Sequence, residues 1–179
     1  MAHVVAGLGN PGPRYQGTRH NVGQRVLDQL APTLRAGWRD ERWALVARGR
    51  WRDDPVYLIK PQSFMNLSGG PLAAALRRLH ADPSDLIVVY DDIDLPLGTV
   101  RVRMNGSHGG HNGMRSVIET LGTPEIRRVK IGVGRPERKE DVADHVLDRF
   151  QPEEMPVIED AVALAADRVL DLVTRRRSA

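Results

Sequence analysis

A histidine and a group of aspartates are the residues of this sequence best suited to acid–base chemistry. His20 lies in the segment TRHN, between a turn-rich stretch and an apolar helical stripe. Imidazole has an ordinary pKa close to neutral pH, so it is a natural proton acceptor. Asp91, Asp92 and Asp94 follow an apolar run in the segment VVYDDIDLP. Because a carboxylate bonded to an imidazole fixes its tautomer, and Asp91 lies nearest the end of the predicted strand, we predict that Asp91 orients His20 as a general base.

Each of these residues also has another interpretation. His20 could be an exposed residue at the start of a helix. The aspartates could bind a divalent cation, or they could form the turn before LPLG, which explains Asp94 better than Asp91. His108 and His111 in the segment SHGGHNG could extend a metal site. That segment is too rich in glycine to place two imidazoles predictably, so we expect no metal ion.

Two asparagines precede predicted helices in glycine-rich segments. Asn66 lies in FMNLSGG and Asn112 lies in SHGGHNG. An asparagine at such a place can cap the helix, and the backbone amides behind it can hold an anion. Its side-chain amide can also donate to the oxyanion of an acyl-transfer reaction. Capping and oxyanion stabilisation both remain open from the residues alone.

The segment GLGNPG at residues 7–12 matches the G-x-G-x-x-G pattern of dinucleotide-binding folds. In those folds the third glycine opens a helix, whereas here Pro13, Gly17 and a polar run delay the apolar stripe to Val22. No acidic residue ends a second strand about 20 residues later, where the ribose of the nucleotide would need one. The pattern therefore does not indicate a dinucleotide site, and we expect no cofactor.

The elements that must position these residues alternate between strands and helices. The predicted strands span residues 3–8, 43–47, 55–59, 86–90, 98–104 and 129–133. The predicted helices span residues 20–34, 72–79, 114–121 and 152–177. This order predicts an α/β fold with a mixed, twisted β-sheet flanked by helices on both faces. Open sheets of this kind bind ligands at the carboxyl ends of their strands, which is where Asp91 is expected.

The length and composition fit one cytoplasmic domain. The chain has 179 residues, so we expect a single domain over residues 1–179. Cysteine is absent, which excludes disulfides, a thiol nucleophile and cysteine metal ligands. The N-terminal segment lacks the features of a signal peptide, and no apolar run is long enough to span a membrane. We therefore expect a cytoplasmic protein without membrane contact.

Basic residues are concentrated between residues 101 and 139. They are Arg101, Arg103, Arg115, Arg127, Arg128, Lys130, Arg135, Arg138 and Lys139. Arg101 and Arg103 alternate with apolar residues, so we expect both on one face of a half-buried strand. A cationic face suits a polyanionic partner, although a solvated surface explains it equally well.

Four segments together resemble the bacterial-type peptidyl-tRNA hydrolases, in that family's order and nearly its spacing. They are GLGNPGPRYQGTRHN, KPQSFMNLSGG, YDDIDLPLGTVRVR and GGHNGMRSV. The resemblance implies a monomeric enzyme that hydrolyses the ester between peptide and tRNA and so recycles tRNA from aborted translation. It also implies that His20 is the base, that Asp91 orients it and that water is the nucleophile.

The resemblance extends to the residues that contact the substrate. It implies that Asn10 and Asn66 bind the peptide portion and that Asn112 positions water or substrate. Tyr15, Phe64 and His111 are the other residues expected to contact the substrate. A metal-dependent hydrolase and a non-catalytic RNA-binding module are the alternative functions.

A cationic pair is implied for the acceptor stem of the tRNA. Arg103 and Lys130 align with the family's pair that binds the 5′-phosphate, and Arg101 and Arg128 extend that face. The family more often has arginine where Lys130 stands, so this chain keeps the charge but loses a bidentate donor. Tyr90 likewise replaces a histidine found in many relatives.

Overall fold

A single mixed sheet forms the centre of the computed structural model, which describes residues 2–175. The strands are β1 His3–Gly7, β2 Gly37–Asp40, β3 Ala44–Trp51, β4 Asp54–Pro61, β5 Leu86–Asp92, β6 Val100–Arg103 and β7 Arg127–Gly132. They lie in the order β2-β3-β4-β1-β5-β7-β6. The inner strands β4, β1, β5 and β7 are parallel, whereas β2, β3 and β6 add antiparallel pairings at the two edges. The predicted mixed sheet is confirmed.

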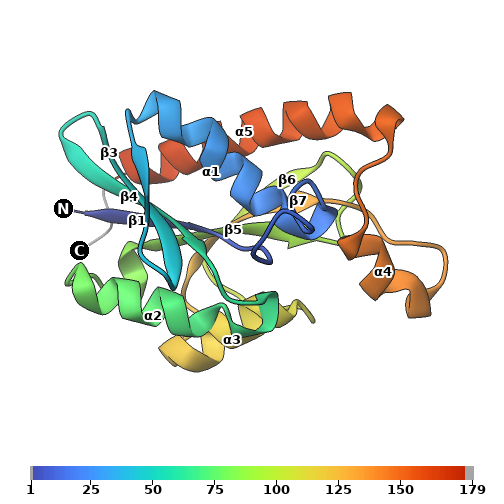
Figure 1. Cartoon of the computed structure of the whole chain (residues 1–179), viewed down its shortest axis with the longest axis horizontal. Coiled ribbons are helices and arrows are strands. Elements are labelled where there is room, and N and C mark those ends of the chain that lie inside the picture. The colour runs from blue at the N-terminus through green and yellow to red at the C-terminus, as the bar shows by residue number, and fades with distance from the viewer. Residues whose placement is uncertain (1, 176–179) are drawn as a thin grey trace.

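Helices cover both faces of the sheet, as predicted (Figure 1). They are α1 Val22–Thr33, α2 Gly69–Arg78, α3 Asn112–Leu121, α4 Val142–Leu147 and α5 Met155–Thr174. One apolar core joins the sheet to α1 and α5, and a second joins it to α2 and α3. Neighbouring strand residues serve opposite cores, since Val5 packs in the first and Val4 in the second.

Two elements of the structure lack a clear sequence signal. Strand β2 is short and mostly exposed, so it has no apolar alternation. Helix α4 has six residues, of which only Val146 is buried. The predicted helix over residues 152–177 begins as a 3-10 turn and ends at Thr174, and residues 176 and 177 lie outside the described part of the chain. Within residues 2–175, no helix is long and apolar enough to cross a membrane.

Glycine allows the start of α1 to approach the sheet closely. A Cβ atom on Gly23 would collide with the carbonyl oxygen of Val89 in β5. A Cβ atom on Gly7 in β1 would lie 2.7 Å from the carbonyl oxygen of Gly23. Larger residues would force these backbones apart. The close approach places the turn before α1, which carries His20, against the carboxyl end of β5.

Candidate active site

A cleft of about 1080 Å³ lies at the carboxyl ends of β1 and β5. Every residue predicted for the site lines this cleft, including His20 and Asp91. The location fits the rule that open α/β sheets bind ligands at the ends of their parallel strands. The roles of the individual residues remain predictions.

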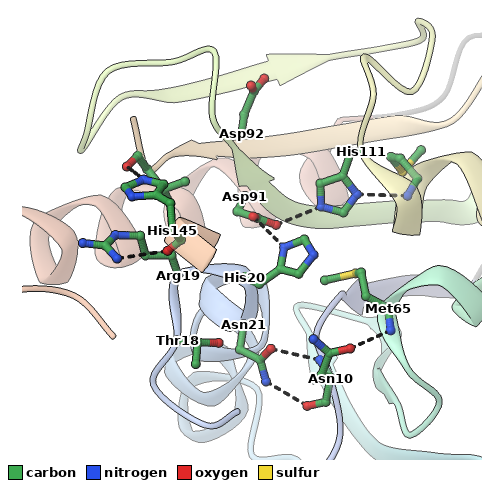
Figure 2. Close-up of polar contacts among 12 residues, drawn as sticks. Asn10, Thr18, Arg19, His20, Asn21, Met65, Asp91, Asp92, His111 and His145 are labelled. Atoms are coloured by element: carbon green, nitrogen blue, oxygen red, sulfur yellow. Dashed lines mark hydrogen bonds and ion pairs between the residues drawn. The ribbon is translucent and has the colours of Figure 1, made fainter. Parts of the chain in front are cut away.

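His20 and Asp91 are directly hydrogen-bonded (Figure 2). His20 belongs to the 3-10 turn Arg19–Asn21 that precedes α1, and its Nδ1 lies 2.7 Å from Oδ2 of Asp91. Asp91 is 1% exposed. Because a carboxylate can only accept, Nδ1 of His20 carries the shared proton. Its Nε2 is therefore left as the proton acceptor.

His111 holds the other oxygen of the same carboxylate. Its Nε2 lies 2.8 Å from Oδ1 of Asp91, and its Nδ1 accepts from the backbone N–H of Met114 at 3.1 Å. The second contact fixes the tautomer, so Nε2 donates to Asp91. Both ring nitrogens are engaged, and the ring packs against those of His20 and Tyr90, at centroid distances of 5.1 and 4.9 Å. His111 is therefore placed to position Asp91. His111 also caps α3, which the sequence had suggested for Asn112.

The pair has opposing pKa shifts that suit a base and its anionic partner. Burial lowers the pKa of His20, but the charge and hydrogen bond of Asp91 outweigh burial, so the net pKa lies above the ordinary 6.5. Burial raises the pKa of Asp91, but His20 and His111 together lower it well below its ordinary range. Asp91 is therefore ionised when His20 takes up a proton.

Asn10 has a fixed amide orientation. Its Oδ1 accepts from the backbone N–H of Met65 at 2.7 Å. The side chain of Asn21 bonds both the N–H and the carbonyl of Asn10, at 2.9 Å each (Figure 2). Nδ2 of Asn10 is therefore the group that can donate into the cleft. Asn21 was not predicted for the site, because nothing in its residue type indicates that it braces Asn10.

The remaining predicted contacts lie on the rims of the cleft. Asn66, in the 3-10 turn Met65–Leu67, and Asn112, the first residue of α3, are both exposed. Tyr15 and Phe64 meet edge to face, with ring centroids 6.3 Å apart, although Phe64 is 55% exposed. This aromatic pair offers an apolar surface beside the histidine.

The predicted cationic residues differ in accessibility. Arg101 and Arg103 are exposed on one face of β6, as predicted. Lys130 faces the same side, since it pairs with Arg101 in the sheet, but its Nζ lies 2.9 Å from Oδ2 of Asp92. Lys130 is thus partly neutralised, and Arg101 and Arg103 are the more available cations.

Arg128 departs from the prediction that it extends the exposed cationic face. It is 2% exposed, and its guanidinium donates to backbone carbonyls in two segments, residues 106–107 and residues 124–126. The acceptors are Gly106, Ser107, Pro124 and Ile126. Strand alternation correctly predicts that Arg128 lies on the same face of the sheet as Arg103. The loop before His111 covers its side chain, so that side chain is not exposed. Arg128 therefore anchors that loop and has little donor capacity left for a phosphate.

The histidines and Asp91 also form a possible metal-binding group. The ligand atoms of His20, Asp91 and His111 lie within 4.8 Å of one another. In the arrangement described above, both N–H protons point at the carboxylate, so a cation would have to displace them. The three residues are thus already joined by hydrogen bonds to the Asp91 carboxylate, and this arrangement needs no metal ion to hold it.

The fold and the histidine–aspartate pair place this chain among α/β proteins with a hydrolase-type site. A family model described as peptidyl-tRNA hydrolase matches residues 4–179. This match covers nearly the whole sequence, so the chain belongs to the peptidyl-tRNA hydrolase family.

Individual relatives agree with this family. A peptidyl-tRNA hydrolase from Sulfurihydrogenibium is 44% identical over 97% of this chain and 92% of its own length. One from Brevibacillus brevis is 46% identical over 92% of this chain and 87% of its own length. The crystal structure of a peptidyl-tRNA hydrolase from Acinetobacter baumannii is 29% identical, with a TM-score of 0.86 over 96% of this chain and 91% of that one.

More distant structures share the fold alone. An Arabidopsis thaliana 5′-methylthioadenosine nucleosidase is 10% identical, with a TM-score of 0.56 over 98% of this chain and 96% of that one. The same architecture thus supports a different chemistry, and function must be argued from the site.

Proposed function

We propose that this protein hydrolyses the ester bond of peptidyl-tRNA, with water as the nucleophile and His20 as the general base. The observation that carries the proposal is the hydrogen bond from Nδ1 of His20 to the buried carboxylate of Asp91. This bond leaves Nε2 free to accept a proton. The family match supplies the substrate, because the residues alone indicate only a hydrolase.

The proposed reaction is a direct displacement by water. His20 takes a proton from a water molecule near Asn112 as that water attacks the peptidyl carbonyl carbon. The amides of Asn10 and Asn66 donate to the carbonyl oxygen as it becomes negative. The ester C–O bond then breaks, and the protonated His20 returns its proton to the departing ribose oxygen of the terminal adenosine, which leaves as a hydroxyl. An ester has a good enough leaving group for this to proceed without a covalent intermediate.

The two ends of the cleft suit the two parts of the substrate. The aromatic pair of Tyr15 and Phe64 lies on the side proposed for the peptide. The cations of β6 lie on the side proposed for the acceptor stem and its 5′-phosphate. RNA helices are bound largely through their phosphates, so recognition is expected to be indifferent to tRNA sequence. We further propose that the enzyme works as a cytoplasmic monomer that recycles tRNA.

Hydrolysis of N-acetylated aminoacyl-tRNA tests the proposed function directly. The protein is expected to release free tRNA at the same rate with and without a strong chelator, because the mechanism uses no metal ion. Acid-precipitable radiolabel measures the reaction. Activity that disappears with chelator and returns with a divalent cation would instead establish a metal-dependent hydrolase. Binding of tRNA without hydrolysis would establish an RNA-binding module.

Salt dependence tests the proposed tRNA surface. Arg103→Gln is expected to weaken tRNA binding and to reduce the slope of log Kd against log salt concentration by about 1. Lys130→Gln is expected to reduce it less, because Asp92 already neutralises this lysine. Fluorescence anisotropy measures Kd. Arg168→Gln serves as the control, because Arg168 is exposed on helix α5, which packs against the face of β6 opposite to Arg101 and Arg103. A slope unchanged by Arg103→Gln would move the tRNA surface elsewhere.

A further inference from the structure

We propose that Arg19 is a positioning residue that fastens α4, one wall of the cleft, to the turn that carries His20. This inference rests on the proposed role of His20 as the base. Arg19 directly precedes His20 and is 5% exposed. Its Nη1 donates to the carbonyl of His145 in α4 at 3.0 Å, and its Nη2 lies 2.8 Å from Oε1 of Glu154, just before α5 (Figure 2 shows the first contact).

The segment between α4 and α5 contacts Arg19 and the preceding Thr18 at several points. The backbone N–H of Arg19 donates to the carbonyl of Asp148 at 3.0 Å, and Thr18 forms an isolated β-bridge with Arg149. The guanidinium carbon lies 5.6 Å from the ring centroid of Phe150. A buried guanidinium is costly unless it is paired and hydrogen-bonded. Arg19 thus favours the one arrangement in which this segment lies against the His20 turn.

Helix α4 depends strongly on such polar contacts. A helix of six residues has little stability of its own, and Val146 is its only buried residue. Its second attachment is His145, whose Nε2 lies 2.9 Å from the carbonyl of Gly134. Val142 and Leu147 line the cleft together with Val146. The position of this wall is therefore set largely by Arg19 and His145.

The same side chain thus acts on two parts of the site. Asp91 holds the ring of His20 from within the sheet, while Arg19 holds the backbone of the same turn from the α4 side. Loss of the Arg19 side-chain contacts loosens the turn and the wall together, although the backbone contacts of the turn to Asp148 and Arg149 remain. A displacement of a reacting group by about 1 Å can cost about 100-fold in rate. The effect is expected in kcat, because the exposed cations that meet the tRNA lie on β6.

Arg19→Lys and Glu154→Gln test the proposal by two routes. Lysine keeps the charge but cannot reach both partners, whereas glutamine keeps an acceptor for Arg19 and removes only the charge. Arg19→Lys is expected to lower kcat by about 10- to 100-fold with KM changed by less than about twofold. Glu154→Gln is expected to lower kcat less. Hydrogen exchange of the α4 amides is expected to speed up in the same order.

The control variant is Asp28→Asn, which breaks the ion pair between Lys60 of β4 and Asp28 of α1. It is expected to leave kcat and α4 exchange unchanged. All variants are assayed well below their melting temperatures. Faster α4 exchange with normal kcat, or reduced kcat with normal α4 exchange, would overturn the proposal. Normal turnover by a variant without His20 would instead refute His20 as the base, on which this inference rests, and would leave the exchange result intact.

Discussion

His20→Ala is expected to lower kcat by about 10²- to 10⁴-fold, which is the usual contribution of a positioned general base. The affinity for tRNA is expected to stay close to normal, because the cations of β6 remain in place. The substitution removes the only group in the proposed mechanism that both accepts the proton of water and returns it to the leaving oxygen. Single-turnover hydrolysis of N-acetylated aminoacyl-tRNA, together with Kd for deacylated tRNA, separates the two effects.

A matched control is His80→Asn. His80 is exposed at the end of α2 and has a left-handed backbone conformation with φ of 52°, which asparagine tolerates. This variant is expected to retain full activity. Thermal unfolding of His20→Ala checks that the loss is not a folding defect, since Asp91 loses one of its two imidazole donors. Turnover by His20→Ala within a few fold of normal would refute the assignment of the base.

Much of the fold follows from local patterns in the sequence. The apolar runs and alternations at β1, β5, β6 and β7 reflect burial in one or both cores, so they predict strands directly. Strand β2 has no buried face, and α4 is too short for a helical period, so neither has a pattern to detect. Their positions are determined by tertiary contacts.

The residues of the site likewise fall into those that the sequence predicts and those that it does not. His20 and Asp91 can be paired in advance, because residue chemistry and the carboxyl ends of parallel strands both indicate them. The burial of Arg128 could not be predicted, because alternation gives the face of a strand but not the loop that covers it. Arg19 carries no signal, since its partner Glu154 lies 135 positions away along the chain. Contacts of this range arise only from the folded topology.

Asp91→Asn is expected to lower kcat/KM by about 10³- to 10⁴-fold, because it imposes the wrong tautomer on His20. An asparagine amide has one oxygen and one NH₂ group, whereas Asp91 accepts from two imidazoles. His111 must donate through Nε2, because Met114 N–H occupies its Nδ1. The amide oxygen therefore goes to His111 and the NH₂ group to His20. Nδ1 of His20 then becomes an acceptor, and its Nε2 carries the proton and cannot act as a base.

The pH profile of the residual activity distinguishes this explanation from a simple loss of orientation. In the native protein Asp91 raises the pKa of His20 above 6.5, so kcat/KM is expected to rise with pH through a midpoint above that value. Without the carboxylate, burial and the hydrogen bond from the asparagine NH₂ group both disfavour the charged ring and lower the pKa of His20, so the midpoint moves to lower pH. Asp94→Asn, in an exposed ion pair with Arg135, is the control and is expected to keep the native midpoint. An unchanged midpoint in Asp91→Asn would mean that Asp91 does not set the proton affinity of the base, and that its partner must be sought elsewhere.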